Sequence, residues 1–264
     1  MSADSIHLLL ERRPDGLLVV TLNRPEVRNA FNTVMGQELF DLFTALGQSP
    51  AETRCVIMTG AGDKAFCAGA DLKEREGMGE TTWLAQHALY ERMMLAVVDC
   101  PVPVLAAVNG AAMGGGFELM LCCDFAYAST AARFALPEVS RGIMPGGGGT
   151  QTLPRAIGER RAKEIIWSGQ PVSAETASDW GFVNRLCEPD DLMTETLTLA
   201  EAICANAPLS IRQTKKAIHW GLQMDQRTGM AVEIEAYNQL IPTEDRREGV
   251  LAFNQKRPPR FKGR

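Results

Sequence analysis

Asn109-Gly-Ala-Ala-Met-Gly-Gly-Gly-Phe-Glu118 is the stretch from which the fold and chemistry of this chain are best read. It follows the apolar run 102–108, which is typical of a buried strand, and its three glycines open a predicted helix. The N–H groups of residues 114–116 then fall in a first helical turn, where they lack partners and can stabilise negative charge. The alternative is a close strand–helix crossing that glycine merely permits. This stretch alone does not separate the two interpretations.

A second loop, Phe66-Cys-Ala-Gly-Ala-Asp71, also lies between a predicted strand and a predicted helix that begins near Asp71. It could supply another N–H group, from Ala70. Taken by itself, the loop is better explained as an ordinary connection in which Asp71 caps the helix. Two such loops in one α/β layer favour a shared anion site.

Two glutamates complete the candidate site. Glu118 falls in the first turn of the glycine-opened helix, where a surface carboxylate would simply favour the helix dipole. Glu138 follows the apolar residues 134–137, which are unusual company for a solvated carboxylate. If both face one dry pocket, repulsion and desolvation would keep one protonated near neutral pH. Such a pair can move a proton and activate water at once.

The glycine run 145–149, Pro-Gly-Gly-Gly-Gly, precedes another helix-start pattern. A tight passage near a ligand or another backbone segment would explain it. A purely flexible loop is the alternative.

Short β-rich runs alternate with helical ones through about the first 190 residues, which predicts a layered α/β fold. Residues 6–12 and 17–22 read as a hairpin, 33–47 as a helix and 55–60 as an apolar strand. A helix over 83–98 and the strand 102–108 repeat the pattern. After about Pro189 the strands stop, and helices are expected at 190–205, 208–223, 227–240 and 243–254. The last nine residues carry five basic side chains, which predicts a solvated tail, with phosphate contact as the alternative.

Composition excludes several classes of function. The chain has 264 residues, 27 basic against 32 acidic side chains and a formal charge of -5, so no positive field draws in nucleic acid or anionic lipid. It has no long apolar run and no basic leader at its N-terminus. The seven cysteines lack CxxC spacing and several lie in apolar strings, as expected of buried thiols in a cytoplasmic protein. The three histidines are too scattered for a metal site, so no metal is expected.

A dinucleotide-binding motif is the rival interpretation. Residues 60–65, Gly-Ala-Gly-Asp-Lys-Ala, satisfy the G-x-G-x-x-A form after a strand. That motif should open a long helix in the first βα unit, whereas here residues 66–69 interrupt it. Nicotinamide binding is therefore disfavoured.

At these residues the chain resembles the crotonase (enoyl-CoA hydratase/isomerase) superfamily over nearly its whole length. The matching stretches are 23–30, 66–73, 109–118, 136–138, 145–151 and 248–256. The resemblance implies an α/β spiral of ββα units over residues 1–190 and a helical trimerisation region over 191–264. It implies assembly as a homotrimer or a dimer of trimers.

The resemblance also implies roles for individual residues. The N–H groups of Ala70 and Gly115 would hold a thioester oxygen, and Glu118 and Glu138 would occupy both acid/base positions of the hydratases. No separate cofactor is implied, because coenzyme A is part of the acyl-CoA substrate. The residues implied in contacts with coenzyme A or substrate are Arg28, Ala68, Ala70, Asp71, Leu72, Lys73 and Gly114, together with Phe253 and Lys256, which would come from the C-terminal helix, of this or a neighbouring subunit.

Hydration of 2-enoyl-CoA thioesters is the leading expectation, because both glutamates are kept. Residues 66–75, 145–158 and 241–263 look especially like methylglutaconyl-CoA hydratase, and a double-bond isomerase or dehydratase is a further alternative. Outside enzymes, the alternative is a non-catalytic acyl-CoA-binding protein. One branch of the methylglutaconyl group binds RNA through a lysine-rich helix, but the corresponding residues 33–54 contain no lysine, so that function is not expected. Residues 75–95 are expected to help form the pocket for the acyl tail, although core packing explains their apolar side chains equally well.

Overall fold

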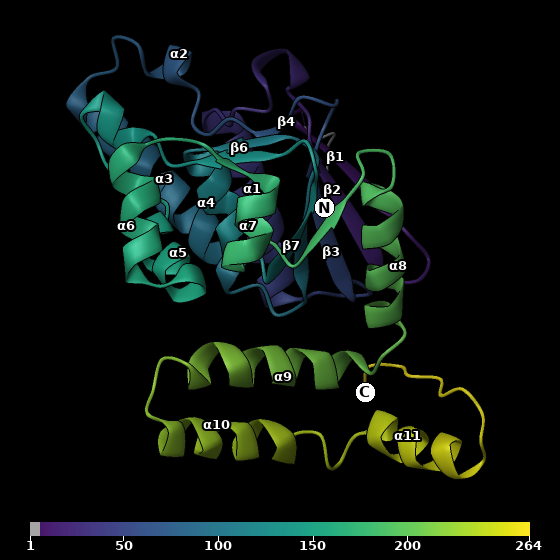
Figure 1. Cartoon of the computed structure of the whole chain (residues 1–264). Coiled ribbons are helices and arrows are strands. Elements are labelled where there is room, and N and C mark those ends of the chain that lie inside the picture. Colours follow the sequence, from purple (N-terminus) through teal and green to yellow (C-terminus); the bar gives the residue numbers. More distant parts are fainter. Residues whose placement is uncertain (1–5) are drawn as a thin grey trace.

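The computed structural model describes residues 6–264 (Figure 1). The expectations for residues 1–5, as part of the spiral domain and as an N-terminus without a basic leader, fall outside the described residues. A six-stranded sheet has the order β1-β2-β3-β5-β7-β10 and forms the centre of the fold. Its strands are β1 (Leu8–Arg12), β2 (Leu17–Leu22), β3 (Cys55–Gly60), β5 (Val104–Val108), β7 (Phe125–Ser129) and β10 (Arg185–Cys187). Only the β1–β2 pair, the predicted hairpin, is antiparallel within this sheet of the described residues.

A second, four-stranded sheet has the order β4-β6-β8-β9. It contains β4 (Ala65–Cys67), β6 (Ala111–Met113), β8 (Arg133–Ala135) and β9 (Val172–Ser173). Each long strand β3, β5 and β7 is followed directly by one of its short strands, so the chain winds as a spiral between two sheets. This confirms the predicted α/β spiral and adds β6, which the sequence did not distinguish from the glycine-rich turn.

The helices of the core are α1 (Thr33–Gln48), α2 (Leu72–Arg75), α3 (Glu80–Val98), α4 (Gly115–Cys122), α5 (Gly149–Ile157), α6 (Glu159–Ser168) and α7 (Ala174–Trp180), with the 3-10 turns η1 (Pro25–Val27) and η2 (Glu138–Arg141). Helix α1 begins where predicted because the Asn32 side chain accepts a hydrogen bond from the Met35 amide. Its buried residues recur at helical spacing and pack against α3. The predicted helices at 33–47 and 83–98 are therefore confirmed to within a few residues.

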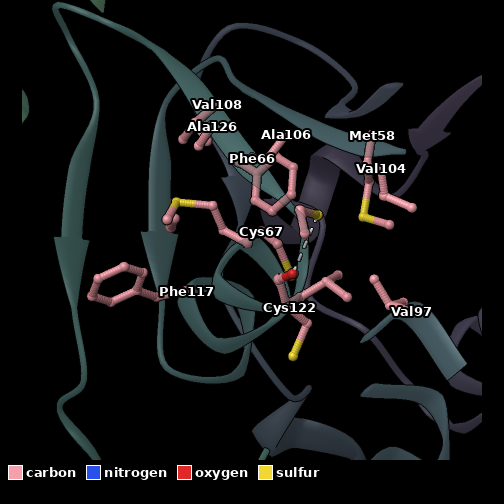
Figure 2. Packing of buried hydrophobic residues seen from close by; sticks show 14 of the residues in the cluster. Met58, Phe66, Cys67, Val97, Val104, Ala106, Val108, Phe117, Cys122 and Ala126 are labelled. Atoms are coloured by element: carbon pink, nitrogen blue, oxygen red, sulfur yellow. Dashed lines mark hydrogen bonds between the residues drawn. The ribbon is translucent and has the colours of Figure 1, made fainter. Parts of the chain in front are cut away.

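Both faces of the central strands β2, β3 and β5 are covered, which explains their continuous apolar sequences. On one face, Met58, Val104 and Ala106 pack with the buried Phe66 and Phe117 (Figure 2). On the other, alternate residues of the same strands pack against α8 (Leu192–Cys204). Pro101 and Pro103 precede β5 rather than interrupt it. All seven cysteines are free and buried, as the sequence predicted.

The C-terminal region consists of α8, α9 (Pro208–Gly221), α10 (Gln226–Asn238) and α11 (Glu244–Asn254), close to the predicted ranges. Helix α8 lies on the sheet, while α9, α10 and α11 extend below the core in Figure 1. Exposed apolar side chains gather on these three helices and on the turn after α9: Ile218, Trp220, Leu222, Met224, Met230, Ile234, Tyr237, Val250, Leu251 and Phe253.

The basic side chains of the C-terminal tail are mostly exposed, as predicted for a solvated tail, but its backbone is held to α11. The amides of Lys262 and Gly263 donate to the buried carboxylate of Asp245, at 2.7 and 2.8 Å. Arg257 forms a bidentate ion pair with Glu248, which lowers the pKa of that carboxyl group to about 2. The tail folds back on α11 because its two acidic partners satisfy main-chain donors as well as a guanidinium group.

Candidate active site

Helix α4 begins at Gly115 and presents its first amides to a cavity. Gly114 precedes it with φ of 53°, a conformation that glycine adopts without strain. Its own amide donates to the Ala135 carbonyl at 2.8 Å and so joins the helix start to β8. Because Gly115 is the first residue of the helix, its N–H group has no acceptor among the described residues.

The second loop places the Ala70 amide beside this helix start. Phe31 brackets Ala70, since its amide donates to the Gly69 carbonyl and its carbonyl accepts from the Asp71 amide, each at 2.9 Å. These bonds fix the loop and leave the Ala70 N–H group without an acceptor among the described residues. The Asp71 side chain caps α2, as predicted. It also forms an ion pair with Arg24 at 3.0 Å.

The two loops meet so closely that side chains are excluded. A Cβ on Gly115 would lie 3.7 Å from the Ala70 nitrogen but only 2.6 Å from the ring of Phe31. A Cβ on Gly69 would lie 2.8 Å from the Met113 carbonyl oxygen. The glycines therefore bring two unpaired amides together, as an oxyanion hole requires.

Glu118 lies one turn into α4 and is 4% exposed. Its Oε1 atom accepts hydrogen bonds from the amides of Gly147 and Gly149, at 2.7 and 2.9 Å. Burial raises the pKa of Glu118, while these two amides act in the opposite direction because they stabilise the anion. The predicted tight passage at 145–149 is thus a backbone cradle for this carboxylate.

Glu138 is the first residue of η2, directly after Pro137. Its Oε2 atom is buried and has no hydrogen-bond partner among the described residues. Burial and the neighbouring charge of Glu118 raise the pKa of Glu138 to about 7. A carboxyl group in this state can both hold and release a proton near neutral pH.

These groups line one cavity of about 630 Å³, a size typical of ligand sites. Of the residues singled out from the sequence, Ala68, Ala70, Leu72, Gly114, Gly115, Glu118 and Glu138 line it. Among the described residues, Arg28, Asp71, Lys73, Phe253 and Lys256 do not. Arg28 and Lys73 are exposed and flank the Ala70 loop, and the Arg28 carbonyl accepts from the Ala68 amide. Phe253, 83% exposed, and Lys256 lie at the end of α11.

The segment 75–95 forms part of the cavity wall, as expected. Trp83 and Met94 line the cavity, whereas Met93 belongs to the core. Four polar side chains that the sequence did not single out also line the cavity: Arg75, His87, Glu91 and Arg141. Three of them lie on or near α3, where a weakly amphipathic pattern gave no sign of which face meets the cavity.

The rejected dinucleotide motif does not open a helix. Residues 60–65 connect β3 directly to β4, and Asn109 from the next turn binds the Gly60 and Gly62 carbonyl oxygens at 2.9 and 2.7 Å. No helix among residues 6–264 is long and apolar enough to cross a membrane. Within the same residues, no three side chains of His, Cys, Asp or Glu form a group that could hold a metal ion.

Fold and site together define an enzyme that stabilises an oxyanion and moves protons between carboxylates and water. Comparison with known proteins places this chemistry in a family. The model of the enoyl-CoA hydratase/isomerase family matches residues 12–264, and the chain therefore belongs to that family, the crotonases.

Individual relatives are similar over the whole chain. The crotonyl-CoA hydratase of Syntrophomonas wolfei is 37% identical over 255 residues, covering 97% of each protein. The human mitochondrial methylglutaconyl-CoA hydratase is 38% identical over 96% of this chain and 76% of its own. A crystal structure of enoyl-CoA hydratase from Bacillus anthracis superimposes with a TM-score of 0.95 at 42% identity, covering 98% of this chain and all of the other (100%).

Proposed function

We propose that this protein is an enoyl-CoA hydratase, which adds water reversibly and syn across the 2,3-double bond of an enoyl-CoA thioester. The observation that carries the proposal is that Glu118 and Glu138 line one cavity with the amides of Ala70 and Gly115. Both carboxylates approach this cavity beside the same backbone anion site, so water and proton reach one face of the double bond. Coenzyme A is part of the substrate, and no other cofactor is needed for these steps.

The amides stabilise the charge that hydration develops. Attack of water at C3 moves electrons onto the thioester oxygen, and each well-aimed N–H group contributes about 3 kcal/mol to the transition state. Ala70 and Gly115 supply two such donors from a backbone that glycine contacts hold rigidly. Little reorganisation is therefore required as the enolate forms.

The two glutamates take different roles in proton transfer because their surroundings differ. Two amide donors on Oε1 of Glu118 favour its anion, which suits the group that takes a proton from the attacking water. Glu138, with a pKa of about 7 and an unpartnered buried oxygen, suits the group that delivers a proton to C2. In the dehydration direction the roles reverse.

Loss of the conjugated-thioester absorbance of crotonyl-CoA tests the proposal. Wild-type protein should remove it, and Glu118→Gln or Glu138→Gln should lower kcat by about 10²- to 10⁴-fold with the fold intact. No loss with any short enoyl thioester would overturn the proposal. Isotope-labelled water distinguishes hydration from double-bond isomerisation, because only hydration incorporates the oxygen. Binding of the thioester without turnover would indicate a non-catalytic binding protein.

Hydration of a methylglutaconyl thioester is the second candidate. Arg75 and Arg141 line the cavity, and a carboxylate on the acyl tail could pair with one of them. Arg75 is held by Gln86 at 2.8 Å and lies over the Trp83 ring, at 4.2 Å, so its orientation is fixed. Competition among butenoyl, longer enoyl and glutaconyl-type thioesters distinguishes the candidates. The preferred thioester would also distinguish a role in fatty-acid β-oxidation from a role in amino-acid degradation. Arg75→Gln should selectively weaken binding of the carboxylate-bearing substrate.

Assembly as a homotrimer, or a dimer of trimers, accounts for the remaining implied contacts. The apolar side chains exposed on α9, α10 and α11 would be buried in an interface between subunits. In such an assembly, Phe253 and Lys256 of one copy would contact the coenzyme A bound to its neighbour. Arg28 and Lys73 would then bind phosphates at the mouth of the site. Light scattering should give three or six protomers, and a stable monomer would contradict this assembly.

A further inference from the structure

His87 lies in the cavity but has no part in the proton transfers described so far. It stands on α3, and its side chain is 36% exposed. Its Nε2 atom lies 3.1 Å from Oε1 of Glu91, one helical turn further along. The cavity therefore contains a histidine–carboxylate pair besides the two catalytic glutamates.

The imidazole ring supports the loop that cradles Glu118. A Cβ on Gly146 would lie 2.6 Å from Cε1 and 3.0 Å from Nε2 of His87. Gly146 does not have a positive φ, so the ring contact, rather than the backbone conformation, requires glycine there. The next residue, Gly147, donates its amide to Glu118. His87 and Glu118 thus hold adjacent residues of one loop.

Charge couples the same two side chains. Burial raises the pKa of Glu118, and the amides of Gly149 and Gly147 oppose it, followed by the positive charge of His87. Glu91 faces His87 from its own helix, with its Oε1 atom 3.1 Å from Nε2 of the ring. The other charged groups around the cavity are Glu118 on α4, Glu138 and Arg141 on η2, and Arg75 at the end of α2.

We infer that His87 is a positioning residue for Glu118, which holds the glycine loop by contact and, paired with Glu91, orients the Glu118 carboxylate electrostatically for water activation. The inference rests on the proposed hydration and assigns a role to a pair that the two-glutamate mechanism leaves out. An uncharged residue of similar size at position 87 would keep the contact and lose the charge.

The test compares His87→Gln with the wild type and with Arg92→Gln. Arg92 lies on the same helix but over the ring of Phe40, so its variant removes a positive charge away from the cavity. His87→Gln should lower kcat about five- to twentyfold with KM nearly unchanged. The acidic limb of its kcat profile should move upward by about half a pH unit, because the lost charge makes Glu118 easier to protonate. Arg92→Gln should match the wild type.

Glu91→Gln provides a variant that leaves the loop contact in place. Its side chain is 53% exposed, and it should give a smaller shift in the same direction. A carbon-13 NMR titration of the Glu118 carboxyl group, whose resonance is assigned with Glu118→Gln, measures the coupling between His87 and Glu118. Because it requires no turnover, this measurement remains decisive if the wild type hydrates no thioester. Wild-type kcat and an unmoved Glu118 titration in His87→Gln would overturn the inference.

Discussion

Oε1 of Glu118 lies 2.7 Å from the amide nitrogen of Gly147, although 29 residues separate them along the chain. The bond joins the helix that opens at the oxyanion hole to the loop that follows Glu138. Because the Gly149 amide reaches the same oxygen, the carboxylate is held at a fixed angle to the cavity. Water activation by this group should therefore depend on backbone geometry as much as on the glutamate itself.

Gly147→Ala should lower kcat by about 10²-fold with little change in stability, because its Cβ would lie 2.9 Å from Oε2 of Glu118 and displace the carboxylate. Steady-state kinetics with crotonyl-CoA measures the effect. Gly79→Ala is the matched control, since nothing lies within 4 Å of its Cβ. Equal kcat in both variants would show that the cradle is dispensable.

Gly115→Ala should cost about 10²-fold or more in kcat, because a methyl group 2.6 Å from the Phe31 ring would turn the amide away from the thioester oxygen. Kinetics and a melting curve are measured together. Adding Phe31→Leu should recover part of the activity by relieving the contact. If the double variant is no better than the single one, the clash is not the cause.

Glu138→Gln should gain stability relative to the wild type as pH rises. The pKa of Glu138 is about 7 in the folded protein, above the value of about 4.3 for an unfolded chain. Its contribution to stability is therefore complete below pH 4 and is lost between about pH 4.5 and pH 7, as the buried group must ionise. The difference in unfolding free energy between variant and wild type should therefore grow as the pH rises from 5 to 8. Denaturant titrations check this, and a constant difference would contradict it.

Lys215→Met should destabilise the protein by about 1–3 kcal/mol. Lys215 joins α9 to the core, since its Nζ atom donates to Asp124 at 2.7 Å and to the Val102 carbonyl at 3.1 Å. Its loss would take a donor from the carbonyl of the buried Val102 and an ion-pair partner from Asp124, which keeps only the Val104 amide on the same oxygen. Lys216→Met, on the exposed side of the same helix, should change the melting temperature little. Similar losses from the two variants would argue against the anchor.

Local pattern made much of this structure predictable. The 33–48 helix follows from its apolar spacing, and the strands 17–22 and 55–60 from their apolar runs between turn residues. Glu138 stood out because apolar residues precede it, which indicated burial. Family resemblance, rather than pattern, pointed to the pairing of Ala70 with Gly115.

Contacts between residues far apart in the chain could not be predicted from the sequence. The strands β4, β6 and β8 have three residues each, too few for a periodic signal, and exist because they pair with one another. The contact of His87 with Gly146 joins residues from different turns of the spiral. The docking of the tail on Asp245 depends on main-chain N–H donors. Because every residue except proline carries such a donor, the sequence does not show which of them bind Asp245.

The anion site at Ala70 and Gly115 consists of main-chain atoms, whereas the acid/base groups are side chains. In the proposed mechanism, enolate stabilisation is thus a property of the scaffold, while the choice of reaction lies in two replaceable positions. A protein engineer could exchange residues 118 and 138 and keep a cavity that still activates thioesters. The fold is accordingly a starting point for redesigned catalysts that form new bonds at C2 or C3.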